Sequence, residues 1–282
     1  MIEIGRSFII GAIQGIAEFL PISSSGHLVL LPYIFKWDYQ GLAFDVALHF
    51  GTVVALVAYF WRDWLALFFS AVRIRNTKYK IREYPDNLLW QIIVASIPAA
   101  MVGLLINGYV EKYLHSPALL AFNLIFFGWL LWFVDKRAKA KYDLQQAQVG
   151  LSGNRPPEIR NTRYSHLFLM GIAQSVALVP GVSRSGITMT AGRSLGLSRE
   201  NSARLSFLLG TPAMIGAFIV EFKDIDKGGL SAAFLIGVIS AAVFGFIAIK
   251  YLLQYLKKSD FSIFLWYRIA LAIMVLALYF TR

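Results

Sequence analysis

The 282-residue sequence contains no cysteine and few charged side chains. The absence of cysteine excludes both a disulfide framework and a metal site built from thiolates. Charged residues make up 15% of the chain, whereas an ordinary soluble domain has about a quarter. Hydrophobic residues reach 57%, and the mean hydropathy is +0.60. Because several apolar stretches reach the ~20 residues that cross a bilayer, the sequence predicts an all-α polytopic membrane protein.

Basic residues outnumber acidic ones, which gives a formal net charge of +11. Such a charge would suggest nucleic acid in a soluble protein, but in a membrane protein basic residues mark cytoplasmic loops. We therefore expect membrane lipids, and no nucleic acid, around this chain. The N-terminus is not typical of a signal peptide, because its first residues are nearly neutral and no small-residue cleavage site follows.

Six segments are predicted to span the membrane, namely 42–61, 88–108, 117–135, 204–222, 232–256 and 263–280. Two further apolar regions, 7–35 and 166–195, are interrupted by Pro, Gly and Ser. The first helix there, 7–20, should stop before Pro21, since proline lacks an N–H and disfavours helix in the preceding residue. A helix of that length reaches only about 21 Å, less than the ~30 Å hydrocarbon core. With a second short helix over roughly 26–35, the region is predicted to be a re-entrant hairpin.

The two interrupted regions are related in sequence. The segment "GAIQGIAEFLPISSSGH" (11–27) matches "GIAQSVALVPGVSRSGI" (171–187), with Gly, Gln, Ser, Ser and Gly at corresponding positions. Further on, "FGTVVALVAYF" (50–60) matches "LGTPAMIGAFI" (209–219). The chain is therefore predicted to be one membrane domain, 1–282. Its halves, approximately 1–140 and 164–282, would each contain a hairpin followed by three spans.

Charge predicts the orientation of these halves. The most basic segments, 73–82 and 136–163, belong in the cytoplasm by the positive-inside rule, and the second is expected to be the loop that joins the halves. This places the first hairpin on the outer side and the second on the cytoplasmic side. Because each half has an odd number of spans, the repeat is predicted to have inverted topology. Broken helices of such repeats form a site near the bilayer midplane.

Four residues before the first break, Gly11, Gln14, Gly15 and Glu18, share one helix face because they lie three or four positions apart. The glycines would let another backbone approach closely. Gln14 and Glu18 could then simply form hydrogen bonds between helices. A carboxylate at membrane depth is costly, however, and is functional by default. We therefore predict that Glu18 belongs to a site, with Gln14 beside it.

Three hydroxyls, Ser23, Ser24 and Ser25, follow the break and precede a helix. One serine would suffice as a helix cap. Three serines followed by Gly26 are typical of an anion site at a helix N-terminus, where phosphate fits well. His27 is either a structural histidine or an acid, base or hydrogen-bond partner of a nucleophilic serine.

The second break differs from the first at two informative positions. Leu178 corresponds to Glu18, and Arg184 corresponds to Ser24. One hairpin therefore has the acid and the other a guanidinium, whose planar fork suits bidentate phosphate binding. Further hydroxyl donors on the second hairpin are Ser183, Ser185 and Thr188.

Three other polar residues are predicted to be structural. Asp45 and His49 lie four positions apart in the first span, and we expect them to pair with each other. Arg268, near the start of the last span, is expected to be a cytoplasmic anchor.

Two motifs, "QGIAEFLPISSSGH" (14–27) and "PGVSRSGIT" (180–188), resemble the signatures of the bacterial undecaprenyl-pyrophosphate phosphatases, the bacitracin-resistance family. The first signature is Glu or Gln, three residues and Glu, followed by a serine-rich loop and His. The second is Pro-Gly-x-Ser-Arg-Ser-x-x-Thr. The resemblance runs the length of the chain. It implies functional positions at Gln14, Glu18, Ser23, Ser24, His27, Ser183, Arg184 and Thr188.

The resemblance also implies a plasma-membrane enzyme whose active site opens to the outer, periplasmic side. It would remove the terminal phosphate of undecaprenyl pyrophosphate, which recycles the lipid carrier of peptidoglycan synthesis and confers bacitracin resistance. A divalent cation, Mg²⁺ or Ca²⁺, is implied as well, held by Glu18 with Gln14 as a further ligand. Because Gln14 occupies a position that the family also fills with Glu, we expect the diphosphate to supply part of the coordination. A homodimer is compatible with the sequence.

The sequence leaves the nucleophile and one alternative function open. Ser24 would attack phosphorus with Glu18 or His27 as its base, but attack by His27 or by water fits the same residues. Discontinuous helices in inverted repeats also occur in secondary transporters. The alternative function is therefore a transporter or flippase of a polyprenyl phosphate or another anionic lipid. The acid on one hairpin and the arginine on the other favour chemistry over transport.

Overall fold

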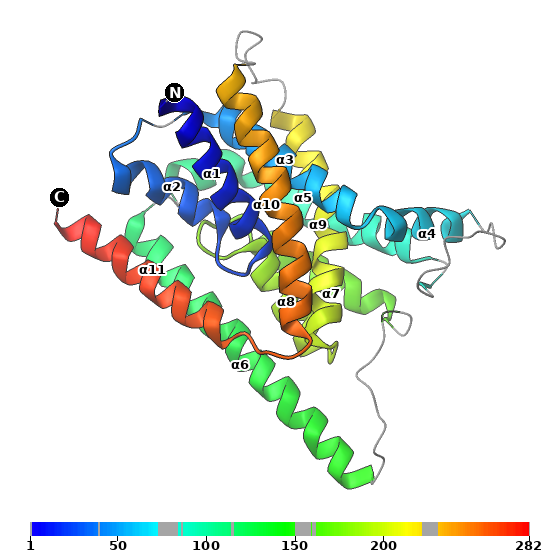
Figure 1. Ribbon diagram of the computed structural model, residues 1–282. Helices are drawn as coiled ribbons and strands as arrows, with labels where there is room; N and C mark the ends of the chain where they lie inside the picture. The colour runs from blue at the N-terminus through cyan, green and yellow to red at the C-terminus, as the bar shows by residue number, and fades with distance from the viewer. Residues whose placement is uncertain are drawn as a thin grey trace.

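The computed structural model describes residues 2–38, 40–72, 84–85, 87–113, 116–149, 159, 162–221 and 231–281. In these residues the chain forms eleven helices (Figure 1). The first six are α1 (Ile2–Phe19), α2 (Ser24–Phe35), α3 (Leu42–Tyr59), α4 (Trp61–Ala71), α5 (Leu88–Tyr113) and α6 (Pro117–Val149). The remaining five are α7 (Tyr164–Val176), α8 (Arg184–Ser194), α9 (Arg199–Glu221), α10 (Ala232–Leu256) and α11 (Ser262–Phe280).

Five helices, α5, α6, α9, α10 and α11, are long and apolar enough to cross a bilayer. A sixth crossing results if α3 and α4 are counted as one bent span. Many large apolar side chains lie on the surface of the bundle, among them Leu105, Ile219 and Trp266. Such a surface is suited to hydrocarbon rather than water. The prediction of an all-helical polytopic membrane protein is confirmed.

The predicted first span, 42–61, is not a straight helix. α3 ends at Tyr59, and α4 leaves it at an angle of 69°. Phe60, at the bend, is fully buried. In the first turn of α4, both oxygens of Asp63 accept hydrogen bonds at 2.7 Å from Nη2 of Arg204 on α9. This ion pair fixes the direction of α4, and sequence periodicity could not indicate a partner so far along the chain.

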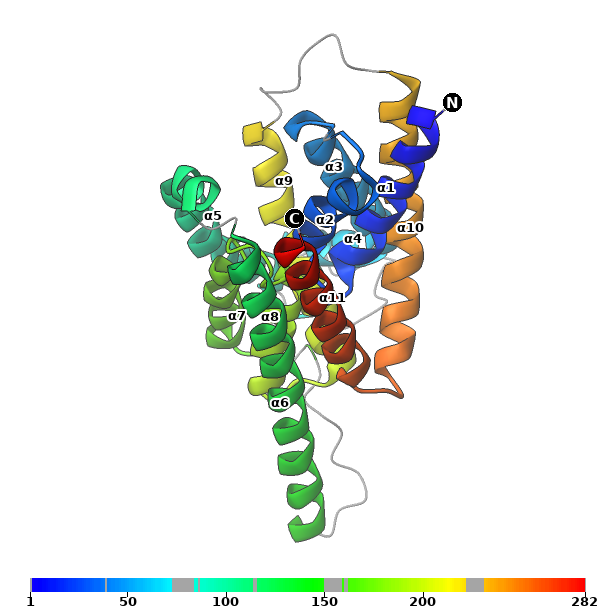
Figure 2. The ribbon, with the colours of Figure 1, turned by 90° about the vertical axis from the view of Figure 1, so that its left-hand side faces the viewer.

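The first part of the segment expected to be a loop, residues 136–149, is helical. α6 continues to Val149 because Lys, Arg, Ala and Gln, which dominate this stretch, are strong helix formers. Figures 1 and 2 show this end of α6 extending beyond the other helices. The carboxylate of Asp135, where the charged part begins, binds Arg193 at 2.7 Å and Arg199 at 2.8 Å. The other basic segment, 73–82, lies outside the described residues.

The first helix of each broken pair packs against a long helix from the other half of the chain. α1 lies along α10, as both views of the ribbon show, and α7 packs on α5. Gly11 and Gly171, which occupy corresponding positions in the sequence, make both approaches close. A Cβ at Gly11 would collide with the carbonyl of Gly237, and a Cβ at Gly171 with that of Ala95. The predicted close backbone approach at Gly11 is therefore found.

Candidate active site

The two breaks have the same local geometry. α1 stops before Pro21, as predicted, and α2 begins at Ser24. Ser23 and Ser183, which immediately precede α2 and α8, both have φ of +73°. This left-handed conformation is uncommon for residues other than glycine and marks a strained turn. Each strained turn places the next residue, Ser24 or Arg184, at a helix N-terminus.

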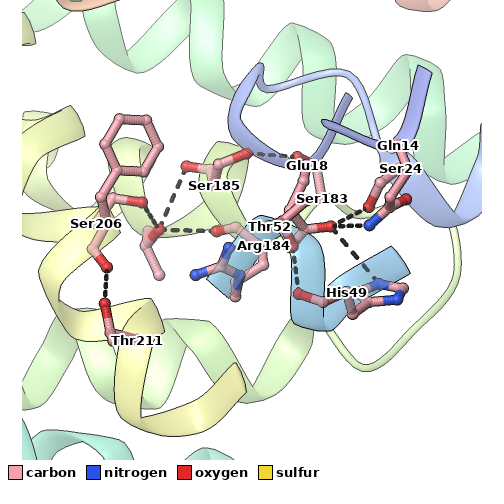
Figure 3. A network of polar contacts seen from close by, with 12 residues as sticks. Gln14, Glu18, Ser24, His49, Thr52, Ser183, Arg184, Ser185, Ser206 and Thr211 are labelled. Carbon is pink, nitrogen blue, oxygen red and sulfur yellow. Dashed lines mark hydrogen bonds and ion pairs between the residues drawn. The ribbon is translucent and has the colours of Figure 1, made fainter. Parts of the chain in front are cut away.

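Glu18 is at the centre of a polar cluster (Figure 3). Its Oε1 accepts a hydrogen bond from Arg184 Nη2 at 3.0 Å. Its Oε2 accepts from Ser24 Oγ at 2.6 Å and from Gln14 Nε2 at 3.1 Å. The carboxylate is only 7% exposed. The structure therefore brings together four of the predicted site residues, although Arg184 lies 166 positions after Glu18 in the chain.

Arg184 has hydrogen-bonding capacity to spare. Its Nη1 is buried and has no partner in the part of the chain that the structure describes. The guanidinium lies against the bare Cα of Gly210 on α9, where a Cβ would overlap Nη1. Buried donors are nearly always satisfied in proteins. The free Nη1 is thus suited to donate to a ligand, and charge-assisted bonds to phosphate are the strong bonds that arginine makes.

The serines of the second break hold the two breaks together. Ser183 Oγ caps α8 by accepting from the N–H of Gly186 at 3.2 Å, and it also lies 3.2 Å from Ser185 Oγ. Ser185 Oγ donates to the carbonyl of Leu20 at 3.1 Å. The second break is therefore bonded directly to the first.

The remaining predicted hydroxyls lie in two places, Thr188 behind the backbone of Arg184 and Ser23 and Ser25 at the first break. Thr188 Oγ1 donates to the carbonyl of Arg184 at 2.7 Å and lies 2.5 Å from Ser206 Oγ on α9. It thus supports the backbone that carries the guanidinium. At the first break, Ser23 Oγ lies 3.2 Å from Ser25 Oγ, the same pairing that Ser183 and Ser185 make. Ser23 is buried and Ser25 is exposed.

His27 forms its hydrogen bonds outside the cluster around Glu18. Its Nδ1 lies 2.7 Å from the carbonyl of Ser23, so Nδ1 is the protonated, donating nitrogen. Its Nε2 lies 2.6 Å from the hydroxyl of Tyr267, and the two rings are stacked. Both ring nitrogens are therefore engaged, whereas the Ser24 hydroxyl donates to Glu18.

His49 contacts Asp45, the residue with which it was predicted to pair, through the backbone of Asp45. His49 Nδ1 lies 2.8 Å from the backbone carbonyl of Asp45, because helical geometry places that carbonyl beside the ring. His49 Nε2 lies 3.7 Å from Glu18 Oε2, and the side chain of His49 is 41% exposed. His49 is therefore a neighbour of the site that the sequence analysis missed. Its position directly before the repeated segment 50–60 was the available signal.

The prediction for Arg268 was wrong. Its side chain is fully buried and donates hydrogen bonds to carbonyls of both breaks. An anchor at the membrane surface would remain exposed. The signal that could have indicated this is a basic residue several positions inside an apolar segment, where a charge is costly and functional by default.

Fold and site together define a polytopic membrane protein with broken helices and a buried centre of one carboxylate, one guanidinium and several hydroxyls. The chain belongs to the family described as bacitracin resistance protein BacA, whose profile matches residues 7–274. This is the family that the two sequence motifs resemble.

Several relatives are similar to this chain over nearly their whole length. The undecaprenyl-diphosphatase of Pelotomaculum thermopropionicum is 43% identical over 274 residues, which cover 96% of both chains. That of Moorella thermoacetica is 42% identical over 277 residues, 98% of both chains. The undecaprenyl-diphosphatase of Thermodesulfovibrio yellowstonii is 41% identical and covers 100% of both chains.

Proposed function

We propose that this chain is an undecaprenyl-diphosphatase of the bacterial plasma membrane. It hydrolyses the terminal phosphate of undecaprenyl pyrophosphate to give undecaprenyl phosphate, which recycles the lipid carrier of cell-wall synthesis and confers bacitracin resistance. The meeting of Glu18, Ser24 and Arg184 at one buried point carries the proposal, because hydrolysis needs a base, a nucleophile and a phosphate-binding cation. The names and high identity of the relatives support the choice of substrate.

In the first step, Ser24 Oγ attacks the terminal phosphorus. Its proton passes to Glu18 Oε2, to which the hydroxyl already donates at 2.6 Å. The bond between phosphorus and the bridging oxygen breaks, and undecaprenyl phosphate leaves with the electron pair. Arg184 donates Nη1 to the terminal phosphate and stabilises the charge that develops on its oxygens.

In the second step, water hydrolyses the phosphoseryl intermediate. Glu18 transfers its proton to Ser24 Oγ as that oxygen leaves and accepts the proton of the water, and inorganic phosphate is released. His49, 3.7 Å from Glu18 and partly exposed, provides a route for protons to solvent. Attack by His27 is a rival scheme that is less well supported, because both nitrogens of His27 already have partners. Direct attack by water is the other rival scheme.

A divalent cation, Mg²⁺ or Ca²⁺, fits the oxygen donors of this site. Within the described residues, no three or more His, Cys, Asp or Glu side chains cluster as a metal site. Glu18 and Gln14 could hold the ion together with the diphosphate, since Gln14 Oε1 is buried without a partner and hard cations prefer oxygen ligands. The ion would neutralise charge on the diphosphate.

The arrangement in the membrane is part of the proposal. The two broken pairs, α1–α2 and α7–α8, are re-entrant hairpins, and the halves 1–140 and 164–282 are inverted repeats. The equal φ angles of Ser23 and Ser183 and the exchanged packing of α1 on α10 and of α7 on α5 support this. The site then lies at membrane depth and opens to the periplasmic side, with the polyprenyl tail in lipid. A homodimer stays a prediction from the sequence.

The test is release of inorganic phosphate from undecaprenyl pyrophosphate by the purified protein in detergent, with Mg²⁺ or Ca²⁺ added. We expect Arg184→Ala to lose on the order of 10³-fold or more in turnover, the usual contribution of an arginine at a transferring phosphate. Arg62→Ala is the control, because it also removes a guanidinium, but one that lies over the ring of Trp61 on α4 rather than beside Glu18. Normal turnover of Arg184→Ala would refute its role.

The alternative function, a transporter or flippase of a polyprenyl phosphate or another anionic lipid, requires two compartments, whereas hydrolysis does not. Phosphate release in detergent therefore separates the two. A wild-type protein that releases no phosphate under any metal condition, yet moves the labelled lipid between leaflets of a vesicle, would replace the hydrolase by the transporter.

A further inference from the structure

Arg268 joins three segments that lie far apart in the sequence. Its Nη1 donates to the carbonyl of Pro21 in the first break at 3.3 Å. The same Nη1 donates to Val182 in the second break at 3.2 Å, and Nη2 donates to Gly181 at 2.6 Å. Nε donates to the carbonyl of Leu124 on α6 at 2.7 Å. One guanidinium thus binds both breaks and ties them to α6, in addition to the direct bond from Ser185 to Leu20.

The carbonyls that Arg268 holds are close in sequence to the reacting groups. Pro21 lies three residues from both Glu18 and Ser24, and Val182 lies two residues before Arg184. Both turns are strained, since Ser23 and Ser183 have positive φ. A strained turn persists only where its surroundings fix it. Hydrogen bonds to the carbonyls of these turns are such a restraint.

The surroundings of Arg268 leave little room for movement. A Cβ at Gly128 on α6 would lie 3.1 Å from Cδ of Arg268 and 3.2 Å from its Nε. The absence of a side chain at Gly128 therefore makes space for the arginine. Within the described residues, the hydrogen bonds of the guanidinium all go to backbone carbonyls, so it is not a partner of Glu18 or of another acid.

We propose that Arg268 is a positioning residue for the phosphatase reaction. By binding the carbonyls of both breaks, it holds Ser24 and Glu18 of the first hairpin in register with Arg184 of the second. This inference depends on the proposed function. It differs from a general stabilising role because it predicts a loss of turnover larger than the loss of stability accounts for.

The first test replaces Arg268 by lysine. Lysine keeps the positive charge but lacks the planar fork and two of the five N–H donors. We expect Arg268→Lys to lower kcat on the order of 100-fold, as a displacement of about 1 Å in a reacting group does. KM should change by less than about threefold, because all the groups that bind the diphosphate are still present.

The matched control is Arg193→Lys. Arg193, on α8, is also a buried arginine, and it is held by Asp135 of α6 at 2.7 Å. It does not bind the carbonyls of the breaks that Arg268 holds. Both variants should have lower thermal stability in detergent, and only Arg268→Lys should lose turnover at a temperature where both remain folded. Equal turnover of the two variants would overturn the proposal.

A second variant crowds the arginine without removing any of its donors. In Gly128→Ala, the new methyl group would press on Cδ and Nε of Arg268, which hydrogen bonds hold in place. We expect kcat to fall less than in Arg268→Lys, but still by at least about fivefold. Gly103→Ala is the control, because a Cβ there meets only Leu178, at an ordinary distance of 3.7 Å. Full activity of Gly128→Ala would count against the proposal.

A double variant tests whether Arg268 acts through Arg184. If it does, Arg268→Lys should have little further effect on kcat in an Arg184→Ala background, since non-additive effects identify residues that act as a unit. Losses that simply multiply would refute the proposal. Failure of the proposed function would look different, because the wild-type protein itself would then release no phosphate. An active wild type with an equally active Arg268→Lys variant defeats only this inference.

Discussion

Replacement of Glu18 by glutamine tests the proposed chemistry most directly. The carboxylate accepts hydrogen bonds from three side chains, through Oε1 from Arg184 and through Oε2 from Ser24 and Gln14. A carboxamide has only one oxygen, so in either orientation its NH₂ group faces at least one donor. The negative charge that partners the largely buried guanidinium is lost as well.

Two magnitudes follow for Glu18→Gln. Loss of the general base should lower kcat by about 10²- to 10⁴-fold. Leaving Arg184 buried without its counter-charge should reduce the free energy of unfolding by up to about 3–5 kcal/mol. This value is an upper bound because the Arg184 side chain is 14% exposed. Phosphate release and thermal unfolding of the same detergent sample measure both effects.

Asp63→Asn is the matched control for Glu18→Gln. Asp63 is likewise a buried carboxylate bound to an arginine, Arg204, at 2.7 Å, but it holds α4 to α9 rather than forming part of the site. We expect the control to lose a similar amount of stability and to retain turnover while it is folded. If Glu18→Gln keeps turnover within tenfold of the wild type, Glu18 is not the base.

Three further predictions concern the nucleophile, the helix packing and the effect of pH. Ser24→Ala should form no acid-stable phosphoenzyme, and a label that survives an alkaline quench but not an acid quench, mapped to His27, would contradict the serine mechanism. Gly171→Leu should destabilise the protein by several kcal/mol in thermal unfolding, because the carbonyl of Ala95 occupies the space of its Cβ. Burial alone would raise the pKa of Asp260, but the hydrogen bond from Lys136 outweighs burial, and the net effect lowers the pKa to about 2. The resulting stabilisation is below about 1 kcal/mol, because the pair with Lys136 is exposed. It is present above pH ~4 and lost toward pH 2. In a pH series of unfolding temperatures, Asp260→Asn should lack this loss.

The fold was predictable where an uninterrupted apolar run or a proline marks an element. The span at 232–256 agrees with the bounds of α10, since an uninterrupted apolar run determines a spanning helix. The stop before Pro21 follows from the chemistry of proline. The bend between α3 and α4 and the continuation of α6 to Val149 were missed. The bend depends on an ion pair with residue 204, and the continuation depends on helix propensity beyond the apolar segment.

The site was predictable to the extent that its residues are costly in a membrane. Glu18 and Arg184 are charges inside apolar segments, and each stands opposite an uncharged residue, Leu178 or Ser24, when the two breaks are compared. Arg268 and His49 were missed because their partners are backbone carbonyls and a carboxylate on other helices. Only the packing of α11 and α3 against the breaks reveals these contacts.

Opposite charges on the two hairpins allow both charges to be buried at one point. A second carboxylate, or a second guanidinium, at this point would meet its like charge at low dielectric, where like charges repel strongly. Glu18 of one hairpin and Arg184 of the other neutralise each other at 3.0 Å. In the proposed mechanism, a bound diphosphate would give Arg184 a second anion through its free Nη1. This would weaken the hold of Arg184 on Glu18, so that the carboxylate would become a stronger base toward Ser24 when the substrate is in place.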